Sequence, residues 1–405
     1  MCLHAAIPKR VSRMSSMRHA TLLLIVLVFP PLFATGALSR TWYVTVDGSG
    51  DVPTIQAAID TAAPGDEILV APGRYTWENQ GGDEIALLVV YRGCNGFTLR
   101  SEAGPEATIL DAQARGRVMF IQGYNHITVD GFTITGGQAP ASSDYVGGGI
   151  CVHISTDDVI RNCVFTDNWG IYGGGFWATS RCNTRLENCT FFGNSAERYG
   201  GGIGVGYNQV LLTVTGCTVI GNSAGQYGGG IAAIQSTMIV EHTVVMGNEA
   251  GNMGGGLCAT DTEALTVTGT TFSENRAPLG GGVYARGTSS LVLTRSIVAF
   301  AREGAGVVVE PTAAVQLGCT DVFGNMGGDA IPASVIDLGG NFSADPLFCG
   351  APGSWDMTLH ADSPCLPGFH PGGAECGLIG ARGAGCGSVP VTPATWGRIK
   401  KAYSR

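Results

Sequence analysis

The side chains best suited to chemistry recur at one position of a repeated unit. Each unit contains an asparagine, and the position seven residues before it holds, in successive units, Arg161, Glu187, Thr215, Glu241 and Thr268. If the units stack as strands, Glu187 and Glu241 lie two strands or about 9.6 Å apart. That spacing is near the upper limit for the two carboxylates of an inverting glycosidase. Arg161 and Arg185 are candidate partners or bases. The alternative is a row of solvated charges, whose cross-strand pairs contribute under about 1 kcal/mol each.

Two acidic pairs in turns are candidate calcium ligands. Asp157 precedes Asp158, and Asp261 lies two residues before Glu263, at corresponding turns of two repeats. Calcium prefers oxygen ligands and is abundant outside cells. The chain lacks the Gly-Gly-x-Gly-x-Asp repeat that binds calcium in other solenoids, so ordinary surface turns are the competing interpretation. The sequence requires no cofactor, and calcium is the ion it allows.

Aromatic side chains and an inserted loop are candidate binding features. Trp177 and Tyr284 are expected to point outward beside glycine triplets, where exposed rings could stack on sugars, although isolated surface aromatics are common. Asp144 and Tyr145 lie in an insertion over 137–146 that lengthens one turn. Loops on a rigid scaffold often bind ligands, and an unconstrained loop is the alternative. The sequence contains no recognisable Ser/His/Asp arrangement for nucleophilic catalysis.

The composition excludes several classes of protein. The 405 residues carry 23 Lys+Arg against 32 Asp+Glu, a net charge of −9. Such a chain has little basic surface to follow the phosphates of a nucleic acid, so no nucleic-acid partner is expected. An apolar content of 44% argues against disorder, and the 63 glycines show no three-residue period, which excludes collagen.

The N-terminal residues are typical of an export signal. Arginines precede an apolar run over 20–33, and small residues follow up to Ala37, which predicts a signal peptide over 1–37. A transmembrane anchor is the alternative, but two prolines interrupt the run before the roughly 20 residues that a span needs. The chain is therefore expected to be secreted or associated with the cell envelope. Contact with a membrane is expected only through this signal or through the C-terminal tail.

The cysteines favour the same location. Removal of 1–37 leaves twelve of the thirteen cysteines, an even number that suits disulfides in an exported chain. A zinc site is the alternative, but no Cys-x-x-Cys spacing occurs. Four cysteines crowd the segment 346–388 and are expected to staple it as a C-terminal cap: Cys349, Cys365, Cys376 and Cys386.

An internal repeat predicts the fold. Glycine triplets begin at positions 147, 173, 200, 228, 254 and 280, and all but the first follow the repeated asparagine by five or six residues. Apolar residues alternate between these landmarks, which indicates short, half-buried strands. Three such strands in about 26 residues describe one coil of a parallel β-helix, in which equivalent residues of neighbouring coils form ladders. An all-β solenoid is therefore expected over 81–345.

The ends of such a stack need covers. The segment 54–62 has the apolar spacing of a short amphipathic helix, so an N-terminal cap and first coil are expected over 41–80. The residues 389–405 form a basic tail, for which envelope docking and a frayed end are both open. The repeated asparagine is expected to adopt a left-handed backbone conformation and to hydrogen-bond its equivalent in the next coil.

Two families share these motifs. Phe-x-x-Asn followed by Gly-Gly-Gly-Ile, as at Phe191–Asn194 and 200–203, resembles the repeat of the polymorphic outer-membrane protein family. The segments 47–59 and 68–75 are similar to the opening of pectin-lyase-like right-handed β-helix proteins. The resemblances imply a right-handed β-helix exposed at a bacterial surface. They do not select an activity, because this superfamily includes lyases, hydrolases, esterases and adhesins.

Two functions follow as hypotheses. The first is a non-enzymatic adhesin or glycan-binding protein, whose partner is a polysaccharide or a cell-surface glycan or protein. The second is a lyase or glycoside hydrolase that acts on an acidic polysaccharide. The resemblance implies that a lyase would use calcium and an arginine or lysine base, and that a hydrolase would use paired carboxylates, here Glu187 and Glu241.

Overall fold

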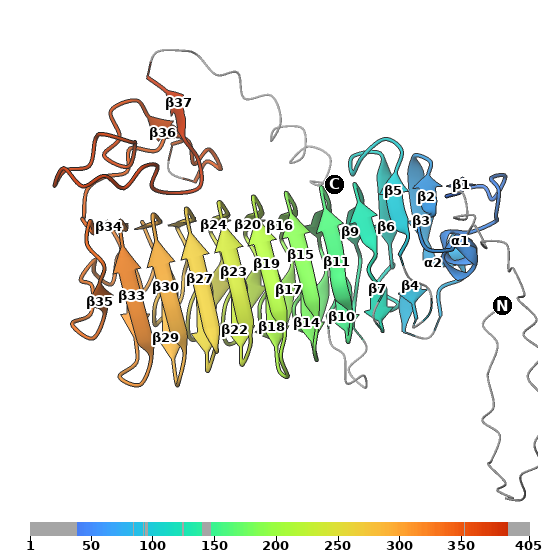
Figure 1. Ribbon diagram of the computed structural model, residues 1–405, viewed down its shortest axis with the longest axis horizontal. Helices are drawn as coiled ribbons and strands as arrows, with labels where there is room; N and C mark the ends of the chain where they lie inside the picture. The colour runs from blue at the N-terminus through green and yellow to red at the C-terminus, as the bar shows by residue number, and fades with distance from the viewer. Residues whose placement is uncertain are drawn as a thin grey trace, which may run out of the picture.

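The chain folds as a parallel β-helix, as the repeat predicted (Figure 1). The structure is a computed structural model that describes residues 39–387, except 84, 92, 94–95, 124, 140–146 and 352. The expected signal peptide, the loop residues Asp144 and Tyr145 and the tail 389–405 lie outside the described residues. No described helix is long and apolar enough to cross a membrane.

Each coil contributes one strand to each of three long sheets, and every strand pairs in parallel with its equivalents in the neighbouring coils. Sheet A contains, in spatial order, β1 (Thr41–Val44), β2 (Glu67–Val70), β5 (Thr98–Ser101), β8 (Thr128–Asp130), β11 (Thr156–Arg161), β15 (Asn183–Glu187), β19 (Leu211–Thr215), β23 (Thr237–Glu241), β27 (Ala264–Thr268), β30 (Ser290–Thr294), β33 (Ala314–Gly318) and β35 (Ile336–Asp337). Sheet B contains β3 (Gly73–Thr76), β6 (Thr108–Asp111), β9 (Thr133–Thr135), β12 (Val164–Thr166), β16 (Thr190–Phe192), β20 (Thr218–Ile220), β24 (Val244–Met246), β28 (Thr271–Ser273), β31 (Ile297–Ala299) and β34 (Asp321–Phe323).

The remaining strands complete the coils and the C-terminal region. Sheet C contains β32 (Val307–Val309), β29 (Val283–Arg286), β26 (Leu257–Thr260), β22 (Ile231–Ile234), β18 (Ile203–Gly206), β14 (Phe176–Thr179), β10 (Ile150–His153), β7 (Arg117–Gln122) and β4 (Ala86–Val90). The short sheet D contains β13 (Trp169–Tyr172), β17 (Ser195–Tyr199), β21 (Ser223–Ala224) and β25 (Glu249–Ala250), and a last pair contains β36 (Leu359–His360) and β37 (Ala384–Cys386).

The core consists of ladders of inward side chains. Phe191 pairs in register with Phe165 on one side and with Val219 on the other, and all three are fully buried. The rings of Phe165 and Phe191 stack with their centroids 4.4 Å apart. Since a single coil cannot bury its apolar face, these contacts between coils supply the core that an isolated repeat would lack.

A ladder of buried asparagines follows sheet B. The Asn194 side chain donates to Asn222 Oδ1 at 3.0 Å, and Asn222 Nδ2 donates to Asn248 Oδ1 at 3.0 Å. The expected hydrogen bonds are therefore present, but the left-handed conformation belongs to the preceding residue, with φ of 65° at Gly193 and 61° at Gly221. The preceding residue makes the turn, which leaves the asparagine side chain pointing inward to replace the interrupted backbone ladder.

The glycine triplets are explained by backbone conformation and by close packing. Gly200, the first of its triplet, has a φ of 67°, which disfavours any side chain. At Gly201 an added Cβ would lie 2.3 Å from the Ser223 carbonyl oxygen and 2.4 Å from that of Gly229 in the next coil. In this triplet the first glycine is thus favoured by its backbone conformation and the second by its contact with the next coil.

A short helix covers the N-terminal end, as predicted. Helix α1 (Ile55–Thr61) begins after Thr54, whose hydroxyl accepts a hydrogen bond from Ala57 N, and it buries Ile55 and Ile59. The Gln56 side chain donates to Val89 O and accepts from Val89 N, so it pairs with an edge strand of sheet C. A second helix, α2 (Trp77–Gln80), was not predicted, and its Gln80 accepts from Ile55 N.

The C-terminal segment differs from a simple end cap. Residues 344–387, here called the C-terminal module, lie beside the stack above β34 and β24 (Figure 1). Met357 packs on Ile220 and Met246 of the outer face of sheet B. The last coil is instead covered by the preceding segment, where Ile331 and Val335 pack against the core. The apolar outer face of sheet B explains this placement, because it would otherwise be exposed to water.

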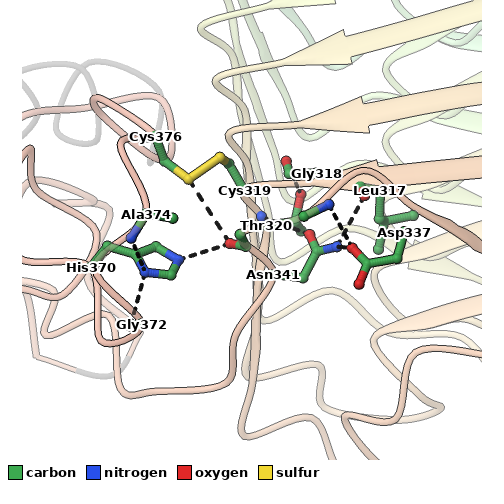
Figure 2. The surroundings of a disulfide bond; sticks show 12 residues. Leu317, Gly318, Cys319, Thr320, Asp337, Asn341, His370, Gly372, Ala374 and Cys376 are labelled. Carbon is green, nitrogen blue, oxygen red and sulfur yellow. Dashed lines mark hydrogen bonds between the residues drawn. A yellow bond between two sulfur atoms is a disulfide. The ribbon is translucent and has the colours of Figure 1, made fainter.

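Two disulfides fasten this region, with a pairing that the sequence did not predict. Cys349 joins Cys386 within the module, whereas Cys376 joins Cys319 of the last coil. Cys365 was expected to be a bridging cysteine but is a buried free thiol. Beside the second disulfide, His370 Nε2 lies 2.9 Å from Gly340 O (Figure 2). Asn341 Oδ1 accepts from Thr320 N at 3.0 Å, so the final coil ends in another side-chain amide.

A buried carboxyl lies at the same junction. Asp321 Oδ1 accepts from Ala344 N at 3.1 Å, and the Cys365 thiol donates to Oδ2 at 3.4 Å. Burial raises the pKa of Asp321 from 3.8 to about 7. The folded protein therefore keeps a proton that the unfolded chain releases between these two pH values, and the free energy of unfolding falls as the pH rises through this window.

The asparagine ladder predicts a large cost for losing one amide. Asn222→Ala removes the acceptor of Asn194 N and Nδ2, which leaves buried donors unpaired. We expect a loss of about 3 kcal/mol in the free energy of unfolding, measured by urea denaturation. Ser223→Ala, at the exposed neighbouring position, is the control and should change it by less than about 0.5 kcal/mol. Equal effects of the two substitutions would contradict this role.

The junction predicts a pH dependence of stability. Asp321→Asn cannot ionise, so the decline in unfolding free energy between pH 5 and pH 8 should be shallower in this variant than in the wild type. Urea denaturation at several pH values measures both slopes. Glu106→Gln changes an exposed carboxyl and should retain the wild-type slope. An unchanged slope in Asp321→Asn would disprove the assignment.

Candidate functional site

The predicted charged row exists on the outer face of sheet A. Arg161 pairs in register with Glu187, and Glu187 with Thr215, which pairs with Glu241. The row continues toward the N-terminus, where Asp130 pairs with Arg161. Strand pairing therefore places Glu187 and Glu241 two coils apart, as expected from the sequence.

The charges of this row are engaged in ion pairs. Arg161 Nε lies 2.9 Å from Asp130 Oδ2, and Arg185 Nε lies 3.3 Å from Glu187 Oε1. Arg161 lies beside Glu187 in the register, but its ion pair is with Asp130 in the preceding coil. These arginines are partly exposed, so each pair contributes little to stability. The row is a solvated set of neighbouring charges.

The candidate calcium ligands do not converge. Asp157 is exposed, accepts from Asn183 Nδ2 and lies 3.4 Å from His126 Nδ1. Asp158 points inward, where burial raises its pKa to about 6. Asp261 accepts from Thr288 N and lies near the exposed Glu263. Their turn is four coils further along the stack than the turn of Asp157 and Asp158. Among the described residues, no group of three potential metal ligands is found.

The predicted aromatic platforms are covered. Trp177 and Tyr284 lie on the outward row of sheet C, but their exposed fractions are only 2% and 3%. Trp177 fills the space over Gly204, where an added Cβ would lie 2.6 Å from the indole ring. The Tyr284 hydroxyl donates to Glu310 at 2.7 Å. Neither ring is available to stack on a ligand, which corrects the expectation from the sequence.

The ring that covers Trp177 belongs to a half-buried ladder of tyrosines that was not predicted from the sequence. Tyr172, Tyr199 and Tyr227, here called the tyrosine ladder, occupy the position before three successive glycine triplets. Their rings stack with centroids 5.1 and 5.2 Å apart and planes 5° and 6° apart. All three are half-buried. The sequence signal for this ladder is the tyrosine just before each of three triplets. Met253 and Leu279 occupy the same position before the next two triplets and continue the row.

Two arginines accompany the tyrosine ladder. Arg198 Nη1 donates to the Tyr172 hydroxyl at 3.4 Å, and the Arg286 guanidinium lies 5.5 Å from the Tyr227 ring centroid. Burial raises the pKa of Tyr199 above its ordinary value of 10.0. Since the ring faces cover one another, the ladder presents ring edges and hydroxyls to the solvent, with arginine donors beside them.

A cavity of about 550 Å³ separates the C-terminal module from the solenoid. Its walls are mostly apolar and include Phe300 of the solenoid and Phe348 and Met357 of the module. An adjoining cavity of about 500 Å³ shares Glu274 and Arg302 with it. This concave site arises from the unexpected position of the module, so the sequence repeat alone did not indicate it.

The buried free cysteines are structural. Cys163, Cys189 and Cys217 form an inward ladder, as expected, and all are at most 1% exposed. Cys189 N donates to Cys217 Sγ at 3.4 Å, so the thiols cap backbone groups of the adjacent coil. Burial raises the pKa of Cys258 to about 12, and it also raises the pKa of Cys189. Buried, protonated thiols of this kind are poor nucleophiles.

The chain was compared with known families and solved structures. Residues 89–244 match the model of a family described as a right-handed beta-helix region. The fold is a right-handed parallel β-helix. The crystal structure of pectate lyase Pel9A is similar with a TM-score of 0.51 and 13% identity, covering 86% of this chain and 97% of that chain. Pectin methylesterase from carrot has a TM-score of 0.36 and 13% identity, covering 76% and 90% of the two chains. No curated protein matches the sequence.

Burial of Trp177 predicts a structural effect of its substitution. Trp177→Ala opens a void beside Tyr172, whose ring centroid lies 5.2 Å away. We expect a loss of about 3 kcal/mol in the free energy of unfolding, measured by urea denaturation. Trp177→Phe keeps a ring at the site and should lose less. If Trp177 were an exposed ligand platform, both variants would unfold like the wild type.

Proposed function

We propose that this chain is an exported bacterial β-helix protein that binds a glycan at a cell surface without cleaving it. The tyrosine ladder is the observation that carries the proposal. It is a half-buried row of stacked tyrosines, each with a hydroxyl, that follows the solenoid axis with its step set by the coil spacing. An extended polysaccharide offers hydroxyl and ring oxygens at a similar interval, and Arg198 and Arg286 supply further donors.

Export and surface location are supported by independent features. The two disulfides of the C-terminal region suit an oxidising compartment. The Phe-x-x-Asn and glycine-triplet repeats resemble those of bacterial surface proteins, and the expected signal peptide would direct the chain out of the cytoplasm. Envelope docking through 389–405 stays part of this proposal.

An enzyme acting on an acidic polysaccharide is the second candidate. The register of Glu187 with Glu241 favours it, because both carboxylates lie on one sheet face. Against it, Glu187 is paired with Arg185, and neither carboxylate lines the cavities described above. We therefore place binding ahead of catalysis.

A polysaccharide panel separates the two candidates. The purified protein is incubated with acidic and neutral polysaccharides, with and without calcium, while binding, unsaturated products and reducing ends are measured. We expect binding without turnover, and about a tenfold loss of affinity, or about 1.4 kcal/mol, in Tyr199→Ala. Tyr199→Phe keeps the stack and tests the hydroxyl alone.

The carboxylate variants provide the opposing test. Glu187→Gln and Glu241→Gln should bind like the wild type. Turnover that disappears in either variant would establish the enzyme and reject the proposal. If a folded Tyr199→Ala variant still bound the glycan like the wild type, the tyrosine ladder would not be the binding site.

A further inference from the structure

The cavity beneath the C-terminal module has the features of a built ligand site. Strand β28 and the corner that follows it supply one wall, and the module loop around 345–357 supplies the other. Its volume of about 550 Å³ falls within the range of small-molecule sites, which are mostly apolar with a few placed polar groups. The wall residues Phe300 and Phe348 meet at an angle of 67° with centroids 6.2 Å apart.

One wall residue carries an unpaired hydroxyl. Ser273 lines the cavity and is 1% exposed, and its Oγ has no hydrogen-bond partner among the described residues. A buried hydroxyl without a partner costs free energy. The residues in register with Ser273 on the adjacent strands are Met246 and Ala299, whose side chains offer no polar partner. A rotation of the Ser273 side chain toward the cavity would let its hydroxyl bond to a ligand there.

An ion pair fixes the polar side of the cavity. Arg302 Nη2 pairs with Glu274 Oε2, and Glu274 Oε1 accepts from Gly353 N of the module at 2.9 Å. Glu274 thus joins the solenoid to the module, while the Arg302 side chain is still 57% exposed. Asp345 also lines the cavity. An arginine and a carboxylate beside phenyl rings offer both donors and acceptors to hydroxyl groups.

The charge around the site disfavours anions. Four carboxylates line the two adjoining cavities, against two guanidinium groups: Glu249, Glu274, Glu303 and Asp345, against Arg276 and Arg302. Arg276 is itself held between Glu249 and Glu303, at 3.5 and 2.8 Å. An added uronate carboxylate would meet a net negative environment, so an uncharged ligand is favoured over an anionic one.

We propose that this cavity binds one uncharged sugar residue, with a pyranose C–H face against Phe300 and Phe348 and its hydroxyls on Ser273, Arg302 and Asp345. The proposal deepens the glycan-binding function proposed above and depends on it for the class of ligand. It assigns neutral sugars to the cavity, at a location separate from the tyrosine ladder.

The decisive variant is Ser273→Ala, because it should change binding without reducing stability. Removing an unpaired buried hydroxyl leaves the free energy of unfolding unchanged or raises it. Ser236→Ala is the matched control, since Ser236 Oγ is also buried without a partner among the described residues and does not line either cavity. Isothermal titration with glucose, galactose, mannose, xylose, galacturonate and choline measures binding to the full-length protein.

We expect at least one neutral sugar to bind, with galacturonate and choline at least tenfold weaker, and a tenfold loss in Ser273→Ala but not in Ser236→Ala. Equal binding by the two variants, preference for galacturonate or choline, or destabilisation by Ser273→Ala would overturn the assignment. Polysaccharide binding that responds to Tyr199→Ala while no monosaccharide binds would reject the cavity proposal alone. Absence of binding to every glycan would reject the proposed function and the cavity proposal together.

Discussion

No coil of this protein can satisfy its own backbone hydrogen bonds. Each strand finds donors and acceptors only in the coils above and below, and the same holds for the apolar face that each coil must bury. At the corner after sheet B the strand ladder is interrupted, and the buried asparagine amides continue it from coil to coil. That corner is therefore invariant in geometry, whereas successive asparagines are 26 to 28 residues apart because other turns absorb the difference.

This dependence explains which features the sequence predicted well. Ladder positions such as Phe191 and the register of Arg161 with Glu187 follow directly from the repeat, because any residue at a given phase must face the same environment as its equivalents. The N-terminal helix was also recognisable from its own apolar spacing. Features that follow from the repeat, or from the spacing of apolar residues within one segment, could therefore be predicted from the sequence.

Features that depend on contacts outside the repeat could not be predicted from the sequence. Trp177 looked exposed because its outward phase was correct, but a tyrosine from the preceding turn of the same coil lies over it. The Cys319–Cys376 bridge connects residues 57 positions apart, and no pattern in the C-terminal segment indicates that it turns back along the solenoid. The cavity depends on that return, so its lining residues have no common sequence signature. The candidate binding sites are therefore the tyrosine ladder and the cavity, and not the predicted carboxylates Glu187 and Glu241.

The C-terminal module touches six consecutive strands of sheet B, β16, β20, β24, β28, β31 and β34. Trp355 lies against Phe192 at one extreme of this contact, and Cys365 meets Asp321 at the other. Tension applied to the chain beyond Gly387 would therefore be shared by several coils loaded side by side, instead of peeling the terminal coil away first. A solenoid fastened along its side in this way resists unravelling from its C-terminal end.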